Sequence, residues 1–201
     1  MDVSSDSTGV STVLVEGVSD QVAITTLAKR RGLDLGAAGI RIVRLGGAHR
    51  IGRVLAQLGL RGDGRRLAGL CDAGEEPVFR RALERAGLGS DLTRAKMEQL
   101  GFYVCVVDLE DELIRALGAS AVEEVLREKG DLHRFRTLQR MPAWRGRPTE
   151  EQLRRFMGSG GSRKIRYARF LIDALDLENV PRPLDRVLAH ATGQGGGREN
   201  A

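Results

Sequence analysis

The sequence contains little cysteine and few aromatic residues. Two cysteines, Cys71 and Cys105, occur among 201 residues, and aromatic side chains make up 4% of the chain. A disulfide-stabilised secreted protein would show more cysteines, and a structural zinc site would show cysteine or histidine ligands clustered in the sequence. Each cysteine belongs instead to an apolar run that we expect to be a buried strand. This predicts two reduced thiols in a core built mainly from aliphatic side chains.

The sequence also lacks a membrane segment, a signal peptide and an ATP-binding loop. No apolar run is long enough to cross a bilayer, and the polar N-terminus has neither the basic nor the apolar region of a signal peptide. Nothing matches the G-x-x-x-x-G-K-[ST] pattern of a Walker A loop. We therefore expect a cytoplasmic protein, with residues 1–11 as a disordered lead-in and residues 193–201 as a disordered tail.

The balance of charge is basic, with a formal net charge of +5. A basic chain fits a nucleic-acid partner without establishing one. Arginine far exceeds lysine, which a high genomic GC content explains as easily as phosphate binding does.

Short apolar strands alternate with helical segments in the first half of the chain. The expected strands are residues 12–16, 40–45, 67–71 and 102–107, and the expected helices between them are residues 18–31, 49–60, 77–86 and 93–100. The strands are apolar throughout rather than alternating, as in a parallel sheet that is buried on both faces. The pattern predicts an α/β domain with a four-stranded, mostly parallel, Rossmann-like sheet over residues 12–118.

The second half of the chain has a helical pattern. We expect a helical extension over residues 119–192 that packs on the first domain, with a flexible break at residues 158–162 (GSGGS). The expected helices are residues 113–126, 148–157, 163–175 and 184–190.

Acidic residues follow three of the expected strands. Glu16, Asp72 and Asp108 stand at these strand ends, and Asp20 lies one helical turn after Glu16. In an open parallel sheet, ligands bind beyond the carboxyl ends of the strands, and converging carboxylates call for a hard divalent cation. Taken singly, Asp20 and Asp108 are better explained as helix caps, whereas Glu16 is a poor capping residue.

These positions carry a resemblance to a known family. Residues 13–20 (VLVEGVSD) resemble the first motif of TOPRIM domains, and residues 69–74 (GLCDAG) stand where the second, Asp-x-Asp, motif belongs. The acidic residue four after the glutamate, the Gly-Gly after the second strand and residues 108–111 (DLED) are similar to the OLD (overcoming lysogenisation defect) family nucleases.

The resemblance implies a DNA nuclease that uses one or two Mg²⁺ or Mn²⁺ ions. Glu16 corresponds to the general base or a metal ligand, Asp72 to the central ligand, and Asp20 and Glu110 to further ligands. Lys164 is the best match for the lysine that OLD-type domains place beyond the sheet to stabilise phosphate charge.

Two departures from the family pattern leave an alternative open. Gly74 replaces the second aspartate of Asp-x-Asp, and either Glu75 or Glu76 would need a shifted loop to substitute for it. OLD proteins also carry an N-terminal ABC-type ATPase, and this sequence shows none, so we expect a stand-alone domain, an excised fragment or a nuclease that works with an ATPase in trans. The alternative is a catalytically weakened module that binds nucleic acid or an ATPase partner without cleavage.

Two other features have competing interpretations. Residues 46–49 (GGAH) fit a phosphate-binding turn at a helix start or, preferably, a plain tight turn. A basic cluster with Phe135 and Trp144 between its arginines fits either a nucleic-acid track or a solvated helix face. Its arginines are Arg134, Arg136, Arg140, Arg145 and Arg147.

Overall fold

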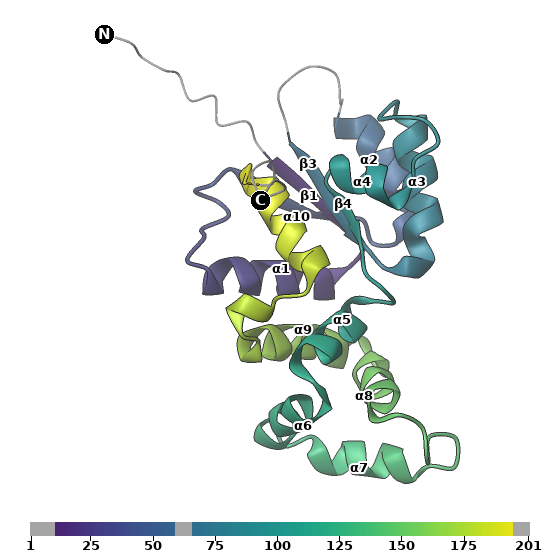
Figure 1. Cartoon of the computed structure of the whole chain (residues 1–201), viewed down its shortest axis with the longest axis vertical. Coiled ribbons are helices and arrows are strands. Elements are labelled where there is room, and N and C mark those ends of the chain that lie inside the picture. The colour runs from purple at the N-terminus through teal and green to yellow at the C-terminus, as the bar shows by residue number, and fades with distance from the viewer. Residues whose placement is uncertain (1–10, 59–65, 195–201) are drawn as a thin grey trace, which may run out of the picture.

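Four parallel strands form one sheet in the order β2-β1-β3-β4 (Figure 1). The computed structural model of the chain describes residues 11–58 and 66–194. The strands are β1 (Ser11–Val15), β2 (Ile40–Arg44), β3 (Leu67–Cys71) and β4 (Phe102–Val104). The predicted fold class, a Rossmann-like α/β sheet with a helical extension, is confirmed, and every strand pair in the described residues is parallel.

Helices cover both faces of the sheet. The helices are α1 (Val18–Arg30), α2 (Ile51–Leu58), α3 (Glu76–Arg85), α4 (Arg94–Gln99), α5 (Leu109–Leu117), α6 (Ala119–Glu128), α7 (Leu132–Arg140), α8 (Thr149–Gly158), α9 (Gly161–Ala174) and α10 (Arg182–Thr192). Short 3-10 turns are η1 (Ala48–Arg50), η2 (Ala73–Glu75) and η3 (Leu177–Asn179). Among the described residues, no helix is both long and apolar enough to span a bilayer.

The alternation of side chains along each strand divides the core in two. Val13 and Val15 of β1 point into a cluster shared with α1, α5, α9 and α10, whereas Leu14 points into a cluster shared with α2, α3 and α4. Successive strand side chains face opposite sides, so a sheet that is apolar on both faces needs a helical layer on each.

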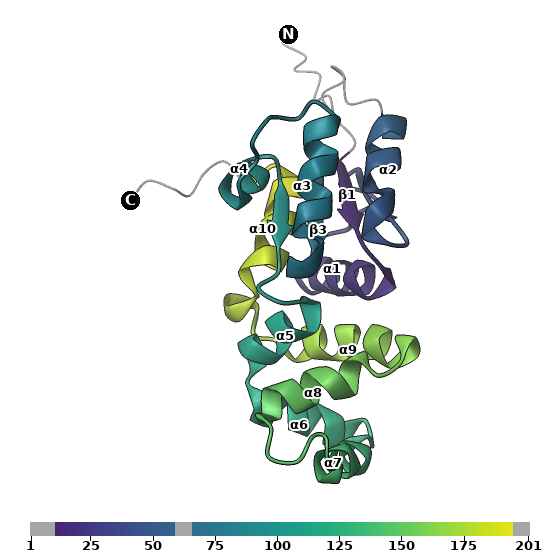
Figure 2. The ribbon, with the colours of Figure 1, turned by 90° about the vertical axis from the view of Figure 1, so that its right-hand side faces the viewer.

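The helices after β4 form a second layer below the sheet and then return to it (Figures 1 and 2). Helices α5 to α9 pack on one another, α9 packs along α1, and α10 packs on β1, β3 and β4. Residues 182–192 therefore belong to the covering of the sheet, although they are the last helix of the chain. The limits of the two expected domains, 12–118 and 119–192, stay a prediction.

Several predicted element bounds were wrong. The helix expected over residues 113–126 is two helices, because Gly118 has a φ of +77° and ends α5. Helix α7 was missed, and β4 ends at Val104 rather than at residue 107. The break at residues 158–162 is shorter than expected, since α8 ends at Gly158 and α9 begins at Gly161.

Parts of three predictions lie outside the described residues. They are the disordered lead-in over residues 1–10, the end of the helix expected over residues 49–60, and the tail over residues 195–201.

Candidate functional site

The carboxyl ends of β1 and β3 bring Glu16 and Asp72 to the same edge of the sheet. The two strands are direct neighbours, with Val15 paired to Leu70, and each acidic residue directly follows its strand. Asp72 is also the residue before η2. Both side chains are half-buried. The edge faces α5 and α9, which lie below it in Figure 2.

Asp20 joins this edge from the first turn of α1. Its Oδ2 accepts a hydrogen bond of 2.8 Å from the backbone N–H of Gly17, which satisfies an N–H at the start of the helix. The residue is 8% exposed. The capping interpretation is therefore confirmed for one oxygen of Asp20, and its role as a metal ligand stays a prediction.

Asp108 and Glu110, both after β4, have different surroundings. Asp108 caps α5, with Oδ1 accepting from the N–H of Asp111 at 2.8 Å and Oδ2 from Arg154 at 2.6 Å. Glu110 is 5% exposed, and its Oε1 is buried without a hydrogen-bond partner. Its Oε2 lies 3.1 Å from the Nζ of Lys164.

Lys164 reaches the carboxylates because α9 packs along α1. At the far ends of the two helices, Arg30 of α1 donates hydrogen bonds of 2.6 Å to the carbonyls of Ile172 and Leu175. The two helices therefore run in the same direction, and the first turn of α9, which carries Lys164, lies near the first turn of α1, which carries Asp20. A residue 54 positions after Glu110 is thus placed beside it.

The charges of this edge act on one another. Burial raises the pKa of Glu16, with Glu75 and Asp20 adding to the shift. Burial also raises the pKa of Asp20, and it raises the pKa of Asp72 to about 7 with a further contribution from Asp20. The pKa of Glu110 is raised by burial although Lys164 opposes the shift.

Lys164 is the cation that acts on each of these four carboxylates. Burial alone would lower its pKa, but the pairing with Glu110 and the fields of Asp72 and Asp20 outweigh burial and raise it. One ammonium group opposes four carboxyl groups, so deprotonation of all four leaves an excess of negative charge that a bound cation would balance.

The donor set fits a hard divalent cation. Its donors are carboxylate oxygens, which Mg²⁺ and Mn²⁺ prefer, and the Oε1 of Glu110 is a buried oxygen without a partner. In the described residues, no three His, Cys, Asp or Glu side chains are gathered closely enough to form a ready metal cage. Side-chain movement would therefore have to accompany metal binding.

Gly74, which stands where the family pattern has its second aspartate, has free space around it. A Cβ built on Gly74 would meet no atom within 4 Å, so there is free space where the family pattern has a carboxylate. Of the two possible substitutes, Glu75 acts on Glu16, whereas Glu76 is held by Arg94 at 2.6 Å. Glu75 is therefore the better placed of the two.

The GGAH turn and the basic cluster, also singled out from the sequence, lie in different parts of the fold. The GGAH turn lies beside the site, since the N–H of Gly46 donates to the backbone carbonyl of Glu16 at 3.0 Å. Phe135 belongs to the core and packs edge-on against Phe156, so it is unavailable to a ligand. Arg134 and Arg136 are paired with Asp131 and Glu123.

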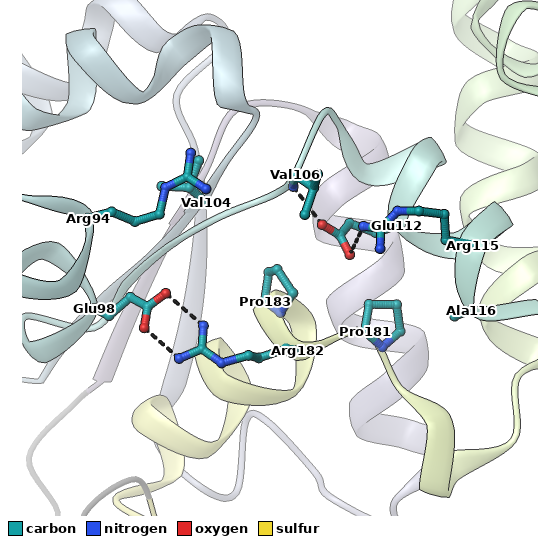
Figure 3. Close-up of a pocket in the computed structure, with 10 residues that line it drawn as sticks. All are labelled: Arg94, Glu98, Val104, Val106, Glu112, Arg115, Ala116, Pro181, Arg182 and Pro183. Atoms are coloured by element: carbon teal, nitrogen blue, oxygen red, sulfur yellow. Dashed lines mark hydrogen bonds and ion pairs between the residues drawn. The ribbon is translucent and has the colours of Figure 1, made fainter. Parts of the chain in front are cut away.

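A pocket of about 390 Å³ lies beside β4, and none of the candidate site residues lines it (Figure 3). Arg182 of α10 and Glu98 of α4 are joined across it by two hydrogen bonds of 2.6 and 2.7 Å. Arg115 is paired with Glu112, whose other oxygen accepts from the N–H of Val106. These contacts join α10 to α4 and α5 to the segment that follows β4, which is a structural role.

A known family model matches part of the chain. Residues 10–62 match the model of the overcoming lysogenization defect protein-like TOPRIM domain. The match covers about a quarter of the chain and includes β1, α1 and β2, with Glu16 and Asp20 among its residues. No curated protein sequence matches the chain.

Solved structures of OLD protein C-terminal regions have the same fold. The C-terminal region of the Xanthomonas campestris pv. campestris OLD protein, phased with platinum, aligns with a TM-score of 0.70 and 23% identity over 92% of this chain and 93% of its own. The C-terminal region of the Burkholderia pseudomallei OLD protein aligns with a TM-score of 0.68 and 17% identity over 94% and 99% of the two chains. The resemblance to the TOPRIM domain of OLD proteins is thus confirmed.

Proposed function

We propose that this OLD-like TOPRIM domain is a metal-dependent nuclease that hydrolyses phosphodiester bonds of DNA. The observation that carries the proposal is the pairing of Lys164 with Glu110, whose other oxygen is buried without a partner, together with the effect of Lys164 on the pKa of three further carboxylates. Uncompensated negative charge at a strand-end edge is costly to the fold, and such cost is typical of sites that bind a ligand.

Glu16, Asp72, Asp20 and Glu110 are the residues that would hold Mg²⁺ or Mn²⁺. Such an ion supplies an activated water and polarises the phosphate. Glu16 is half-exposed at the edge and has a raised pKa, so it is suited to accept a proton from the attacking water. The charges of Asp20, Glu110 and Lys164 all act on the pKa of Asp72, which supports the assignment of Asp72 as the central ligand.

Lys164 would stabilise the charge of the phosphate. Its ammonium group pairs with Glu110 here and stays protonated, since its pKa is raised. A cation fixed beside the scissile group acts mainly on the transition state, in which the phosphate oxygens carry more charge.

A second candidate function is binding of nucleic acid without cleavage. The open space at Gly74 favours it, because a missing ligand weakens the second of two metal positions. The two functions share the same site residues and differ in chemistry.

Plasmid nicking distinguishes the two functions. The chain should convert supercoiled plasmid to the nicked form with Mg²⁺ or Mn²⁺ and should not do so with EDTA. Lys164→Ala should reduce turnover about a hundredfold while changing DNA affinity only a few-fold. DNA binding without metal-dependent nicking by the wild-type chain would establish the second function instead, and a Lys164→Ala chain that loses affinity alone would make Lys164 a backbone contact.

We also propose that the chain is located in the cytoplasm and works with an ABC-type ATPase in trans. The two buried free thiols, Cys71 and Cys105, suit a reducing compartment. Co-purification of the chain with such an ATPase would test the partner.

A further inference from the structure

The end of α7, the loop that follows it and helix α8 carry arginines that have no acidic partner. The guanidinium groups of Arg140, Arg145 and Arg155 make no ion pair with a carboxylate among the described residues, and all three residues are exposed. Arg147 lies 3.7 Å from an exposed Glu151, and its Nε donates a hydrogen bond of 2.9 Å to the backbone carbonyl of Ala143. Over residues 140–155 five arginines face two glutamates, so this segment has an excess of positive charge.

Helix α8 connects this loop to the carboxylate edge. It begins at Thr149, after the loop, and leads up to the start of α9, where Lys164 lies (Figure 1). Arg154 of α8 donates to Asp108 at 2.6 Å, two residues before Glu110. Ten helical residues extend about 15 Å, so the loop stands within a few phosphate spacings of the edge.

The aromatic ring in the loop is covered by cations. Trp144 is partly buried, and the guanidinium groups of Arg147 and Arg155 lie 5.0 and 5.9 Å from its ring centre. Among the described residues, the exposed large apolar side chains are valines and one methionine, and none is aromatic. Single-strand binding relies on exposed aromatic rings for base stacking, whereas guanidinium groups alone contact phosphates.

We propose that Arg140, Arg145, Arg147, Arg154 and Arg155 form a strip that binds the phosphate backbone of duplex DNA and leads it to the carboxylate edge. The proposal rests on the proposed function for the identity of the ligand. Arg140, Arg145 and Arg155 would supply the binding, because forming a phosphate contact costs them no existing ion pair. Trp144 fixes the directions of Arg147 and Arg155 and does not stack on bases.

The test measures binding in EDTA, so that no cleavage accompanies it. A triple variant, Arg140→Gln, Arg145→Gln and Arg155→Gln, is compared with a matched variant, Arg80→Gln, Arg81→Gln and Arg85→Gln. The control removes the same charge from α3, which lies beside the sheet and away from α8 (Figures 1 and 2). Binding of a labelled duplex is followed by fluorescence anisotropy at a series of salt concentrations, and circular dichroism checks that both variants are folded.

The strip variant should lose at least about tenfold in duplex affinity. Its plot of log affinity against log salt should become less steep, with the magnitude of the slope smaller by about 2 to 3. The control should keep the wild-type slope. Equal losses in the two variants, no loss in the strip variant, or a loss confined to single-stranded oligonucleotide would overturn the proposal.

Failure of the strip is distinguishable from failure of the nuclease proposal. If the wild-type chain binds duplex through the strip but does not nick plasmid with Mg²⁺ or Mn²⁺, the strip stands and the nuclease function fails. If the wild-type chain nicks plasmid while the strip variant binds duplex normally, the nuclease function stands and the strip fails.

Discussion

Buried acidic residues occur both at the sheet edge and in the helical layer below it, and their surroundings differ. Glu110 at the edge is 5% exposed and has one oxygen without a hydrogen bond. Asp131, before α7, is 3% exposed, and its oxygens accept from Tyr167 at 2.9 Å and Arg134 at 3.1 Å, with Arg166 at 3.5 Å. Two carboxylates that are buried to a similar extent can therefore have different roles. A carboxylate with its partners supplied stabilises the fold, and one left short of partners indicates a ligand.

Among the edge residues, Asp72 should show the largest effect of a single substitution. Asp72→Ala should abolish metal-dependent nicking, a loss of at least about a hundredfold, because a metal ion contributes several kcal/mol to the transition state. The fold should remain, since Asp72 is a half-buried strand-end residue whose charge is repelled by its neighbours. The measurements are plasmid nicking and thermal unfolding. A purified variant that cleaves at the wild-type rate would remove Asp72 from the site.

Asp131 should show the opposite behaviour. Asp131→Ala should lower the free energy of unfolding by about 2 kcal/mol, because it leaves the buried hydroxyl of Tyr167 without an acceptor. Nicking per folded molecule should not change. Urea unfolding in wild-type and Tyr167→Phe backgrounds checks the reason, because the loss should be smaller where the hydroxyl is already absent. An equal loss in both backgrounds would contradict it.

Glu110 and Asp108 lie within one helical turn, and only Glu110 has an oxygen without a partner. Glu110→Gln should raise the metal concentration for half-maximal nicking about tenfold, because it weakens an oxygen ligand. Asp108→Asn should mainly lower the melting temperature, because both Asp108 oxygens already have partners in α5 and α8. Metal titrations and thermal scans of both variants provide the measurement. The reverse pattern would make Asp108 the ligand and Glu110 the bystander.

The smallest expected effect concerns pH. The pKa of Asp72 is about 7 in the folded chain, above its ordinary value of 3.8, so the folded state holds a proton that the unfolded state has lost. The stability that this provides is complete below pH 3.8 and is lost as pH rises toward about 7. Metal-free wild-type protein should lose less than about 1 kcal/mol over this range through Asp72, since solvent screens a half-buried group.

Urea unfolding in EDTA at pH 5 and pH 8, on wild type and Asp72→Asn, isolates this contribution. The decline with pH should be shallower in the variant. An equal decline would show that other groups cause it.

The sequence predicted the sheet and the acidic residues at its edge because both depend on local pattern. Apolar runs ending in Glu16 and Asp72 mark strand ends, and parallel strands put these ends together. Lys164 could be suggested only through the family resemblance, since its position depends on α9 packing along α1. No spacing rule links residue 164 to residue 110.

The helical layer was predicted less well. Helix α7 was missed because its apolar side is short, with Phe135 and Leu138 as its buried residues among several arginines. The same composition suggested a nucleic-acid contact for Phe135, which tertiary packing against Phe156 rules out. The break between α5 and α6 depends on the backbone of one glycine, Gly118, and single glycines inside helical patterns are ambiguous.

The position of Lys164 on α9 has a consequence for the order of events during protein synthesis. Glu16, Asp20, Asp72 and Glu110 all leave the ribosome before Lys164 does. Until α9 is made, the four acidic groups lack the ammonium that opposes their mutual repulsion. The site is therefore complete only once α9 has been synthesised, and an incomplete nascent chain does not yet have the lysine proposed to act on DNA.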